Sequence, residues 1–145
     1  MKSFLFSILL FCFVSSCSNN NESSKTEVPA SENEDDAARN FIRSVLDQDF
    51  EKAKTMILPD SLNNQYLNLT ERSFQKMKKQ DKNNYKNANI QNYTTRQLND
   101  SVTVAYYTNS FTNKPDSIKL VKKNGQWLVD LKYTFPETKD VLNAQ

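Results

Sequence analysis

The sequence contains no histidine, one glycine and two cysteines among its 145 residues. The absence of histidine removes the commonest general base and the commonest metal ligand. The single glycine, Gly125, excludes the glycine-rich loops that bind phosphates and dinucleotides. Both cysteines lie in the first seventeen residues, so no disulfide can cross-link the remainder of the chain. These absences argue against catalysis, and we predict neither a metal site nor a cofactor.

The first sixteen residues have the features of an export signal. An apolar run of eleven positions extends from Phe4 to Val14, whereas a membrane-spanning helix needs roughly 20. The four residues that end at Cys17, VSSC, resemble the lipobox of bacterial lipoproteins, whose cysteine is lipidated and becomes the first residue of the mature protein. We therefore predict a lipoprotein signal peptide in residues 1–16 and lipidation of Cys17. An ordinary secretory signal is the alternative.

The segment from Cys17 to Asp36 is expected to be a disordered acidic tether between a lipid anchor and a folded domain. Residues 18–36 carry six acidic residues against one lysine and have no aromatic residue. Two or three acyl chains would hold the protein stably on a membrane. Ser18, which follows the cysteine, is typical of sorting to the outer membrane in enteric bacteria, on its periplasmic face or at the cell surface.

From Ala37 onward the apolar residues recur with helical spacing. A first helix is indicated by one face of apolar residues: Ala38, Phe41, Ile42, Val45 and Leu46. Asp49 can cap a second, short helix. A break at residues 59–61 precedes a third helix with an apolar stripe of Leu62, Tyr66 and Leu69. Thr70 or Ser73 is a candidate cap for a further turn that holds Phe74 and Met77.

Two hairpins follow the helices. Segments 87–98 and 101–111 flank Asn99-Asp100, and a two-residue loop there pairs Thr95 with Val104 and Tyr93 with Tyr106. The second hairpin, 116–134, turns at Asn124-Gly125, a strong signal for a type I′ turn. Its register pairs Lys119 with Asp130, and it gathers one apolar face of Ile118, Leu120, Trp127, Val129, Leu131 and Tyr133.

The order of these elements predicts an α+β fold, in which N-terminal helices pack on a curved antiparallel sheet of about four strands. We assign residues 37–136 to this cone-like domain and residues 137–145 to a C-terminal tail. A basic run lies at the end of the helical half: Arg72, Lys76, Lys78, Lys79, Lys82 and Lys86. It is either a solvated helix end or a contact for anionic lipid headgroups. Nucleic acid is not expected as a partner, because no interleaved aromatic motif accompanies the charges.

Two stretches resemble small bacterial lipoproteins with a domain of unknown function. They are ARNFIRSVLDQDFEKAKTMI (38–57) and VKKNGQWLVDLKY (121–133). The second also looks like the last hairpin of the nuclear-transport-factor-two-like superfamily (the cystatin-like or ketosteroid-isomerase-like cone), in which a Gly-x-Trp pair is common. That resemblance implies a bent sheet wrapped round helices, with a pocket at the mouth of the cone. The superfamily contains enzymes as well as binding and assembly domains.

Tyr93, Tyr106, Trp127 and Tyr133 are the candidate pocket residues, and the alternative is that they fill the core. We expect a lipid-anchored envelope protein whose domain binds a protein partner or a small apolar ligand without chemistry. One alternative is a pocket enzyme, similar to isomerases or dehydratases, that uses a tyrosine and a carboxylate. Another is a purely structural subunit of an envelope complex. The sequence does not indicate an oligomeric state.

Overall fold

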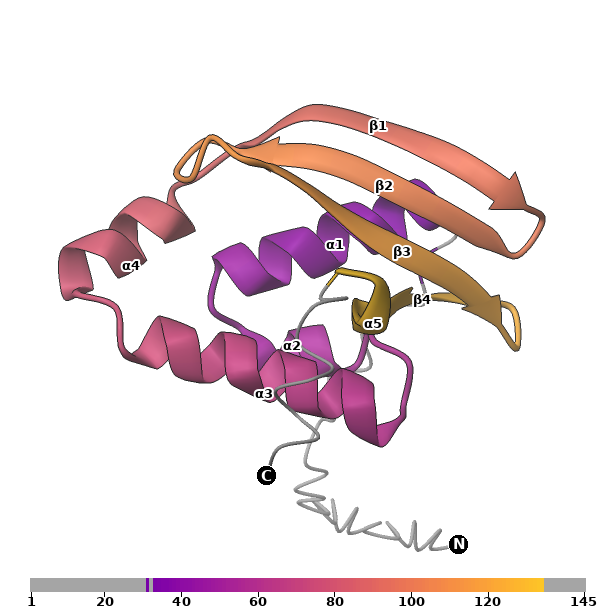
Figure 1. The fold of residues 1–145 in the computed structure, drawn as a ribbon, viewed down its shortest axis with the longest axis horizontal. Coiled ribbons are helices and arrows are strands. Elements are labelled where there is room, and N and C mark those ends of the chain that lie inside the picture. The colour runs from indigo at the N-terminus through magenta and orange to yellow at the C-terminus, as the bar shows by residue number, and fades with distance from the viewer. Residues whose placement is uncertain (1–30, 32, 135–145) are drawn as a thin grey trace, which may run out of the picture.

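The computed structural model of the chain describes residue 31 and residues 33–134. Within these residues, four helices precede a four-stranded antiparallel sheet of strand order β1-β2-β3-β4, and a short helix follows it. The elements are α1 (Glu34–Leu46), α2 (Phe50–Lys54), α3 (Ser61–Gln75), α4 (Lys79–Lys86), β1 (Ile90–Asn99), β2 (Val102–Asn109), β3 (Pro115–Lys123), β4 (Gln126–Asp130) and α5 (Leu131–Thr134) (Figure 1). The predicted α+β class is confirmed. Cys17, the predicted signal peptide and the predicted tail lie outside the described residues.

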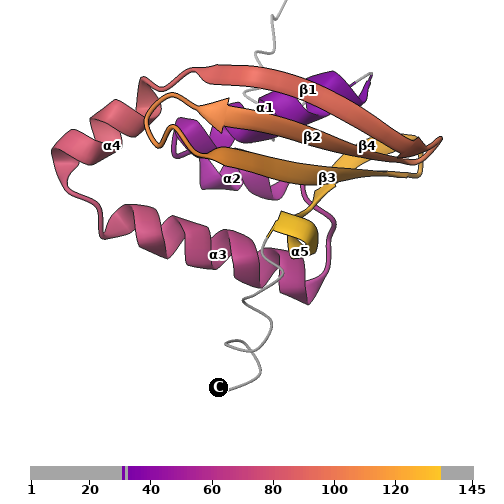
Figure 2. The same ribbon diagram turned by 45° about the horizontal axis from the view of Figure 1, so that its top comes forward.

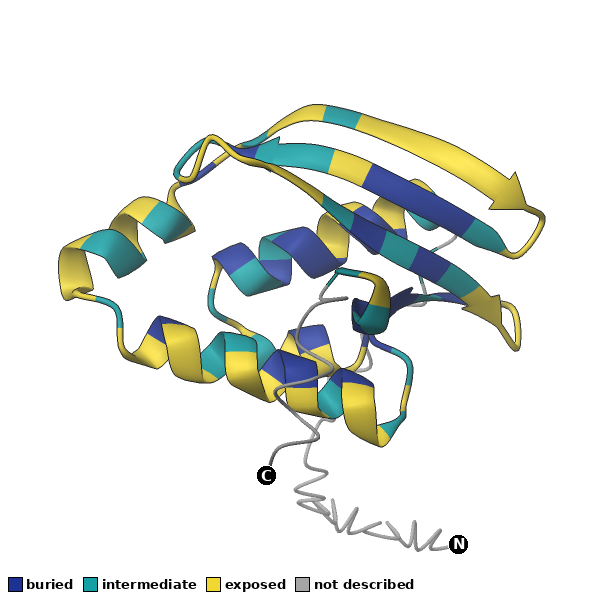
Figure 3. Cartoon of the chain, viewed as in Figure 1, coloured by how far each residue is buried: buried dark blue, intermediate teal, exposed yellow. Residues whose placement is uncertain are grey.

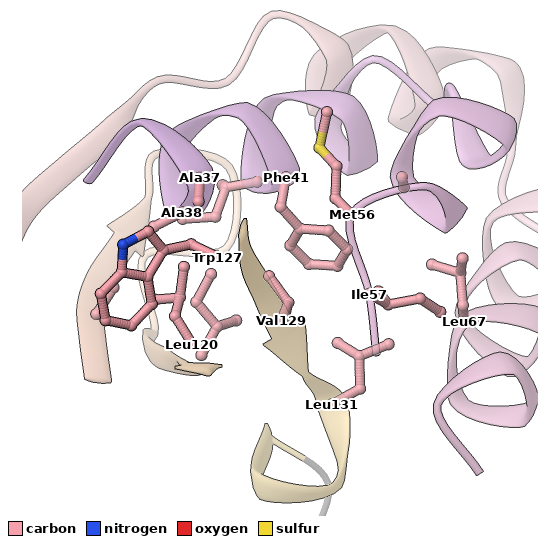
Figure 4. Packing of buried hydrophobic residues seen from close by; sticks show 14 of the residues in the cluster. Ala37, Ala38, Phe41, Met56, Ile57, Leu67, Leu120, Trp127, Val129 and Leu131 are labelled. Atoms are coloured by element: carbon pink, nitrogen blue, oxygen red, sulfur yellow. The ribbon is translucent and has the colours of Figure 1, made fainter. Parts of the chain in front are cut away.

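Helices α1, α2 and α3 lie on one side of the sheet, and we call the sheet face on that side the inner face, while α4 lies beyond the end of the strands (Figure 2). α1 packs against β2, β3 and β4, while α3 lies farther from the sheet. In Figure 4 the Trp127 ring lies below Ala37 and Ala38 of α1, and Ile57 points towards Leu67 of α3. These side chains belong to one buried apolar cluster, so the helices and the sheet share a single core.

The first helix begins earlier than predicted, because an asparagine caps it. The Asn33 side chain accepts a hydrogen bond of 2.9 Å from the Asp36 amide, and the first turn contains Glu34, Asp35 and Asp36. Carboxylates in the first turn interact favourably with the positive end of the helix dipole. The prediction that the disordered tether extends to Asp36 is therefore wrong for residues 34–36.

The third helix presents a face to the core that matches the prediction at Tyr66 and differs from it at Leu62 and Leu69. Leu62 and Leu69 are 39% and 38% exposed, whereas Asn63 is fully buried. Tyr66, Leu67 and Phe74 are the other buried residues of α3. The helix also continues without a break to Gln75, so neither Thr70 nor Ser73 is a cap. A separate helix, α4, follows it and was not predicted.

The register of the first hairpin is shifted from the prediction. The turn lies at Asp100-Ser101, and Thr95 pairs with Ala105 rather than Val104. The turn begins one residue later than predicted, and an extra residue in β1 between Gln97 and Asn99 leaves the pairing one residue away from the prediction. A second irregularity lies between Gln91 and Thr94. Tyr106 alternates along β2 with Ala105 and Tyr107, which both pack in the core cluster, so Tyr106 lies on the other face of the sheet.

The second hairpin has the predicted register as far as Asp130. Asn124 and Gly125 both have positive φ, 52° and 81°, as a type I′ turn requires. Lys119 pairs with Asp130, and their side chains form an ion pair of 3.0 Å. The strand then ends, and Leu131 begins helix α5. The prediction that Leu131 and Tyr133 continue the strand, with Leu131 opposite Ile118, is wrong.

The end of β4 is determined by side chains at the start of α3. The Asn63 Oδ1 atom accepts a hydrogen bond of 2.7 Å from the Leu131 amide, and its Nδ2 donates to Asp60 at 2.8 Å. Lys132 adds an ion pair of 2.7 Å with Asp60. These polar contacts take the place of further strand pairing, so the chain turns away from the sheet and towards α3.

The two outer strands of the sheet differ in their surroundings. The outer edge of β4 is covered, because Val129 exchanges backbone hydrogen bonds with Met56 and Leu58 at 2.8 and 2.9 Å. Strand β1 is exposed along almost its whole length (Figure 3). The buried part of the inner face therefore lies on β2, β3 and β4, where α1 crosses the sheet.

We predict that Asn63→Ala lowers the free energy of unfolding by about 2–3 kcal/mol, because the buried Leu131 amide then loses its acceptor. Urea unfolding followed by circular dichroism measures the change. Asn68→Ala is the matched control, since Asn68 is exposed on the same helix, and it should stay within about 0.5 kcal/mol of the wild type. Equal effects of the two substitutions would contradict the assigned role of Asn63.

A second prediction concerns acid stability. Burial acts to raise the pKa of Asp60, but the hydrogen bonds from Lys132 and Asn63 and the charge of Lys132 outweigh it and lower the pKa from 3.8 to about 2. A carboxyl group with a lowered pKa in the folded state stabilises the fold above its unfolded-state pKa, and this stability is lost as the pH falls. The loss attributable to Asp60 should fall between about pH 4 and pH 2.

Asp60→Asn keeps a side chain that can cap α3 but removes this charge, so its stability should fall less steeply over that range. Urea unfolding midpoints at a series of pH values provide the measurement. Asp49→Asn, which replaces the cap of α2 and leaves the Asp60–Lys132 pair intact, should retain the loss attributable to Asp60. An unchanged slope in Asp60→Asn would show that another group governs acid unfolding.

Candidate functional site

A pocket of about 310 Å³ opens between the helices and the inner face of the sheet. Its walls come from α1, α3, α4, α5 and the ends of β2 and β3 that meet at the Ser110–Lys114 loop. Most of the lining is apolar, and the apolar lining residues are Phe41, Ile42, Val45, Leu46, Leu67, Phe74, Met77, Ile118 and Leu131. The pocket is therefore a mainly hydrophobic site. Tyr107, Asn109 and Asp116 form a polar end on the strands next to the β2–β3 loop, and the hydroxyls of Thr70, Ser73 and Thr134 come from α3 and α5.

Arg43 of α1 and Gln48, which lies just after α1, hold α4 in place as a wall of the pocket. The Arg43 guanidinium donates hydrogen bonds to the carbonyl oxygens of Ala88 and Lys86 at 3.0 and 2.7 Å, and Gln48 Nε2 donates to the Lys82 carbonyl at 3.0 Å. The Lys86 carbonyl lies at the C-terminal end of α4, where carbonyl groups lack partners within the helix. Tyr85 of α4 is thereby positioned towards the pocket.

The polar end of the pocket contains a tyrosine and a carboxylate on neighbouring strands. Tyr107 of β2 and Asp116 of β3 are direct cross-strand partners, and the Tyr107 hydroxyl donates a hydrogen bond of 3.0 Å to Asp116 Oδ2. Burial raises the pKa of Tyr107 above its ordinary value, and the negative charge of Asp116 and this hydrogen bond raise it further. The phenol therefore stays protonated at neutral pH.

A group of aromatic rings adjoins this pair. Phe74 and Tyr85 meet edge to face with ring centroids 4.5 Å apart, and Tyr85 contacts Phe111 at 5.6 Å. Burial raises the pKa of Tyr85, the charge of Asp116 raises it further, and a hydrogen bond with the Asn109 side chain opposes both effects. Asp116 thus acts electrostatically on two phenols of the pocket.

The loop between β2 and β3 sets the position of Asp116. The Asn109 side chain accepts hydrogen bonds from the amides of Phe111 and Thr112 at 2.8 and 3.3 Å, and the Asn113 amide bonds to the Asn109 carbonyl at 2.8 Å. Asn113 itself has a positive φ of 51°, which asparagine tolerates better than most residues. The turn built on Asn109 brings the start of β3 beside Tyr107.

None of the four predicted pocket residues lines this pocket. Tyr93 lies beside α1, where its hydroxyl donates to Asp35 at 3.1 Å and the Arg39 guanidinium lies 3.7 Å from its ring centroid. Burial raises the pKa of Tyr93, as do the charge of Asp35 and the hydrogen bond to it, whereas the charge of Arg39 lowers it. Trp127 is buried in the core.

Tyr106 and Tyr133 come together away from the pocket. Tyr106 is 36% and Tyr133 41% exposed. A side-chain hydrogen bond between the two phenols is the main cause of a raised pKa of Tyr133, with a smaller contribution from burial. Tyr106 lies on the other face of β2 from Tyr107, and the early end of β4 places Tyr133 in α5, so the prediction selected two tyrosines that do not line the pocket.

The predicted basic residues gather around the connection between α3 and α4. Arg72 lies in the last turn of α3, Lys76 caps its C-terminus, and Lys79 begins α4. The Lys82 ammonium donates to the Gln75 carbonyl at 3.0 Å. Arg72 and Lys76 interact favourably with the negative end of the α3 dipole, so these two residues of the basic run have a structural role. Lys82 also ties the two helices together.

The described residues contain no cluster of three or more histidine, cysteine, aspartate or glutamate side chains placed to hold a metal ion. In the same part of the chain, no helix has the length and apolar character needed to cross a bilayer. No protein-family model, curated protein or solved structure matches this chain. The resemblance to the nuclear-transport-factor-two-like superfamily therefore stays a prediction.

Proposed function

We propose that this chain is a lipid-anchored bacterial envelope protein whose domain binds a small, largely apolar molecule in the pocket without converting it. The pocket is the observation that supports this proposal. Its volume of about 310 Å³ lies at the lower end of the range for small-ligand sites, which is roughly 300–1,000 Å³. Such sites combine apolar walls with a few polar groups that fix orientation, and the Tyr107–Asp116 pair supplies such groups here.

A binding role without chemistry is supported by the state of the hydroxyl groups around the pocket. Thr70 and Ser73 donate to carbonyl oxygens of their own helix at 3.0 and 2.9 Å, and Thr134 donates to the Ser117 carbonyl at 3.0 Å. None of these hydroxyls is paired with a general base, which activation as a nucleophile requires.

The Tyr107–Asp116 pair is also the one observation that favours a second candidate, a pocket enzyme that uses a tyrosine and a carboxylate. In that role the Tyr107 hydroxyl would donate to a substrate carbonyl while Asp116 accepts a proton. The raised pKa of Tyr107 makes its phenol a weak acid and so favours the binding role. Turnover of a ketone that is lost in Tyr107→Phe would support the enzyme instead.

We predict that filling the pocket abolishes binding of a neutral apolar probe. N-phenylnaphthylamine should bind the purified wild type saturably, with increased fluorescence. Thr70→Trp places a large ring at the pocket wall and should weaken this binding at least roughly tenfold, because overpacking such a site is costly. Ser73→Trp, at a more exposed lining position, is a second variant.

Asn68→Trp is the matched control, because Asn68 is exposed on the same helix and does not line the pocket. It should leave the affinity for the probe unchanged. Circular dichroism melts establish that the variants are folded. Equal binding by wild type, Thr70→Trp and Ser73→Trp would place the probe elsewhere and refute the pocket as the binding site.

The membrane half of the proposal depends on Cys17. We predict that Cys17→Ala moves the protein from the membrane fraction to the soluble fraction of the cell and prevents incorporation of labelled palmitate. Cys12→Ala is the matched control, since Cys12 lies within the predicted signal peptide, and it should leave both readouts unchanged. A Cys17→Ala protein that still sediments with membranes would contradict the lipid anchor.

A further inference from the structure

Asp116 is the only charged residue among those that line the pocket, all of which belong to the described part of the chain. It is solvent-exposed, which puts its carboxylate at the pocket mouth. One carboxylate oxygen accepts the Tyr107 hydroxyl at 3.0 Å, and the other accepts the Ser117 amide at 2.7 Å. None of the ion pairs formed by the described residues involves Asp116, so its negative charge is not neutralised by a lysine or arginine there.

Aromatic rings line the pocket together with Asp116. Phe74, Tyr85 and Tyr107 all line the pocket, and the faces of aromatic rings attract cations. Apart from burial, the charge of Asp116 is the largest cause of the raised pKa of both tyrosines. A second negative charge at this end of the pocket is therefore disfavoured, whereas a positive charge is favoured.

The Tyr107 hydroxyl donates its hydrogen bond to Asp116, and this direction favours cationic over neutral ligands. The Tyr107 hydroxyl hydrogen is already donated to Asp116, so a ligand carbonyl must compete with a carboxylate for it. The carboxylate keeps acceptor capacity for further donors, because each of its oxygens can accept more than one hydrogen bond. The polar end thus offers acceptors and negative charge, which an ammonium group with several N–H donors would satisfy.

We propose that the pocket selects organic ammonium ions, with the cationic group at Asp116 among the aromatic rings and an apolar body between α1 and α3. This inference rests on the proposed binding function and adds the chemical class of the ligand. Carboxylate, sulfate and phosphate ligands are disfavoured at the same position, because no lining residue carries a positive charge to receive them.

Three probes that share one apolar body test the inference: phenylbutylamine, phenylbutanol and phenylbutyrate. Each is titrated into the purified protein at neutral pH, and displacement of N-phenylnaphthylamine reports its affinity. The amine should bind roughly fivefold more tightly than the alcohol, as expected for a partly solvated ion pair with a cation–π contribution. The carboxylate should bind most weakly. Raising the salt concentration should reduce the advantage of the amine.

Asp116→Asn keeps an oxygen that can accept from Tyr107 and should remove the preference for the amine. Asp100→Asn is the matched control, because it makes the same change of charge in the exposed β1–β2 turn, and it should retain the preference. Tyr107→Phe keeps the charge of Asp116 and should also retain the preference. This second variant covers the case in which Asp116→Asn does not fold.

The possible failures are distinguishable. Equal affinities of the amine and the alcohol for the wild type, with both lost in Thr70→Trp, would overturn the charge selectivity and leave the binding function standing. Equal preferences for the amine in Asp116→Asn and Asp100→Asn would also overturn the role of Asp116 in charge selectivity and leave the binding function standing. If neither N-phenylnaphthylamine nor any of the three probes binds, both the proposed function and this inference fail.

Discussion

The hydrogen bond between the Asn63 side chain and the Leu131 amide joins the helical half of the molecule to the end of the sheet. Asn63 is fully buried, so water does not compete with it for the Leu131 amide. By accepting the Leu131 amide, Asn63 holds the end of β4 against the start of α3, where the chain enters α5. Leu131 and Thr134 then lie in the pocket wall, so the pocket depends on a contact between residues 68 positions apart.

The charge distribution of the domain affects how a cation could reach the pocket. From Ala37 onward the sequence has seventeen lysine and arginine residues against eleven acidic ones, so the domain as a whole weakly repels cations. At physiological ionic strength this repulsion is screened over about 8 Å. Selectivity for an ammonium ion must therefore come from the groups in contact with it, Asp116 and the adjoining rings, rather than from long-range attraction.

Local turn chemistry explains which parts of the fold could be predicted from the sequence. The second hairpin was predictable because Asn124-Gly125 permits one tight turn, and the Lys119–Asp130 pair agrees with that register. The register of the first hairpin was not, since neither glycine nor proline marks the turn at Asp100-Ser101 or the extra residue in β1. The end of β4 was also hidden, because Asn63 determines it from a helix distant in the sequence.

The direction of each side chain along β2 decides which tyrosine belongs to the candidate site. Tyr106 and Tyr107 are adjacent, and the strand directs one of them to each face. The prediction selected Tyr106 and not Tyr107. In the structure Tyr107 faces inward, where the turn built on Asn109 brings Asp116 opposite it. The α+β class does not depend on this choice, because it follows from the order of the elements, whereas the polar end of the pocket depends on the pairing of single residues.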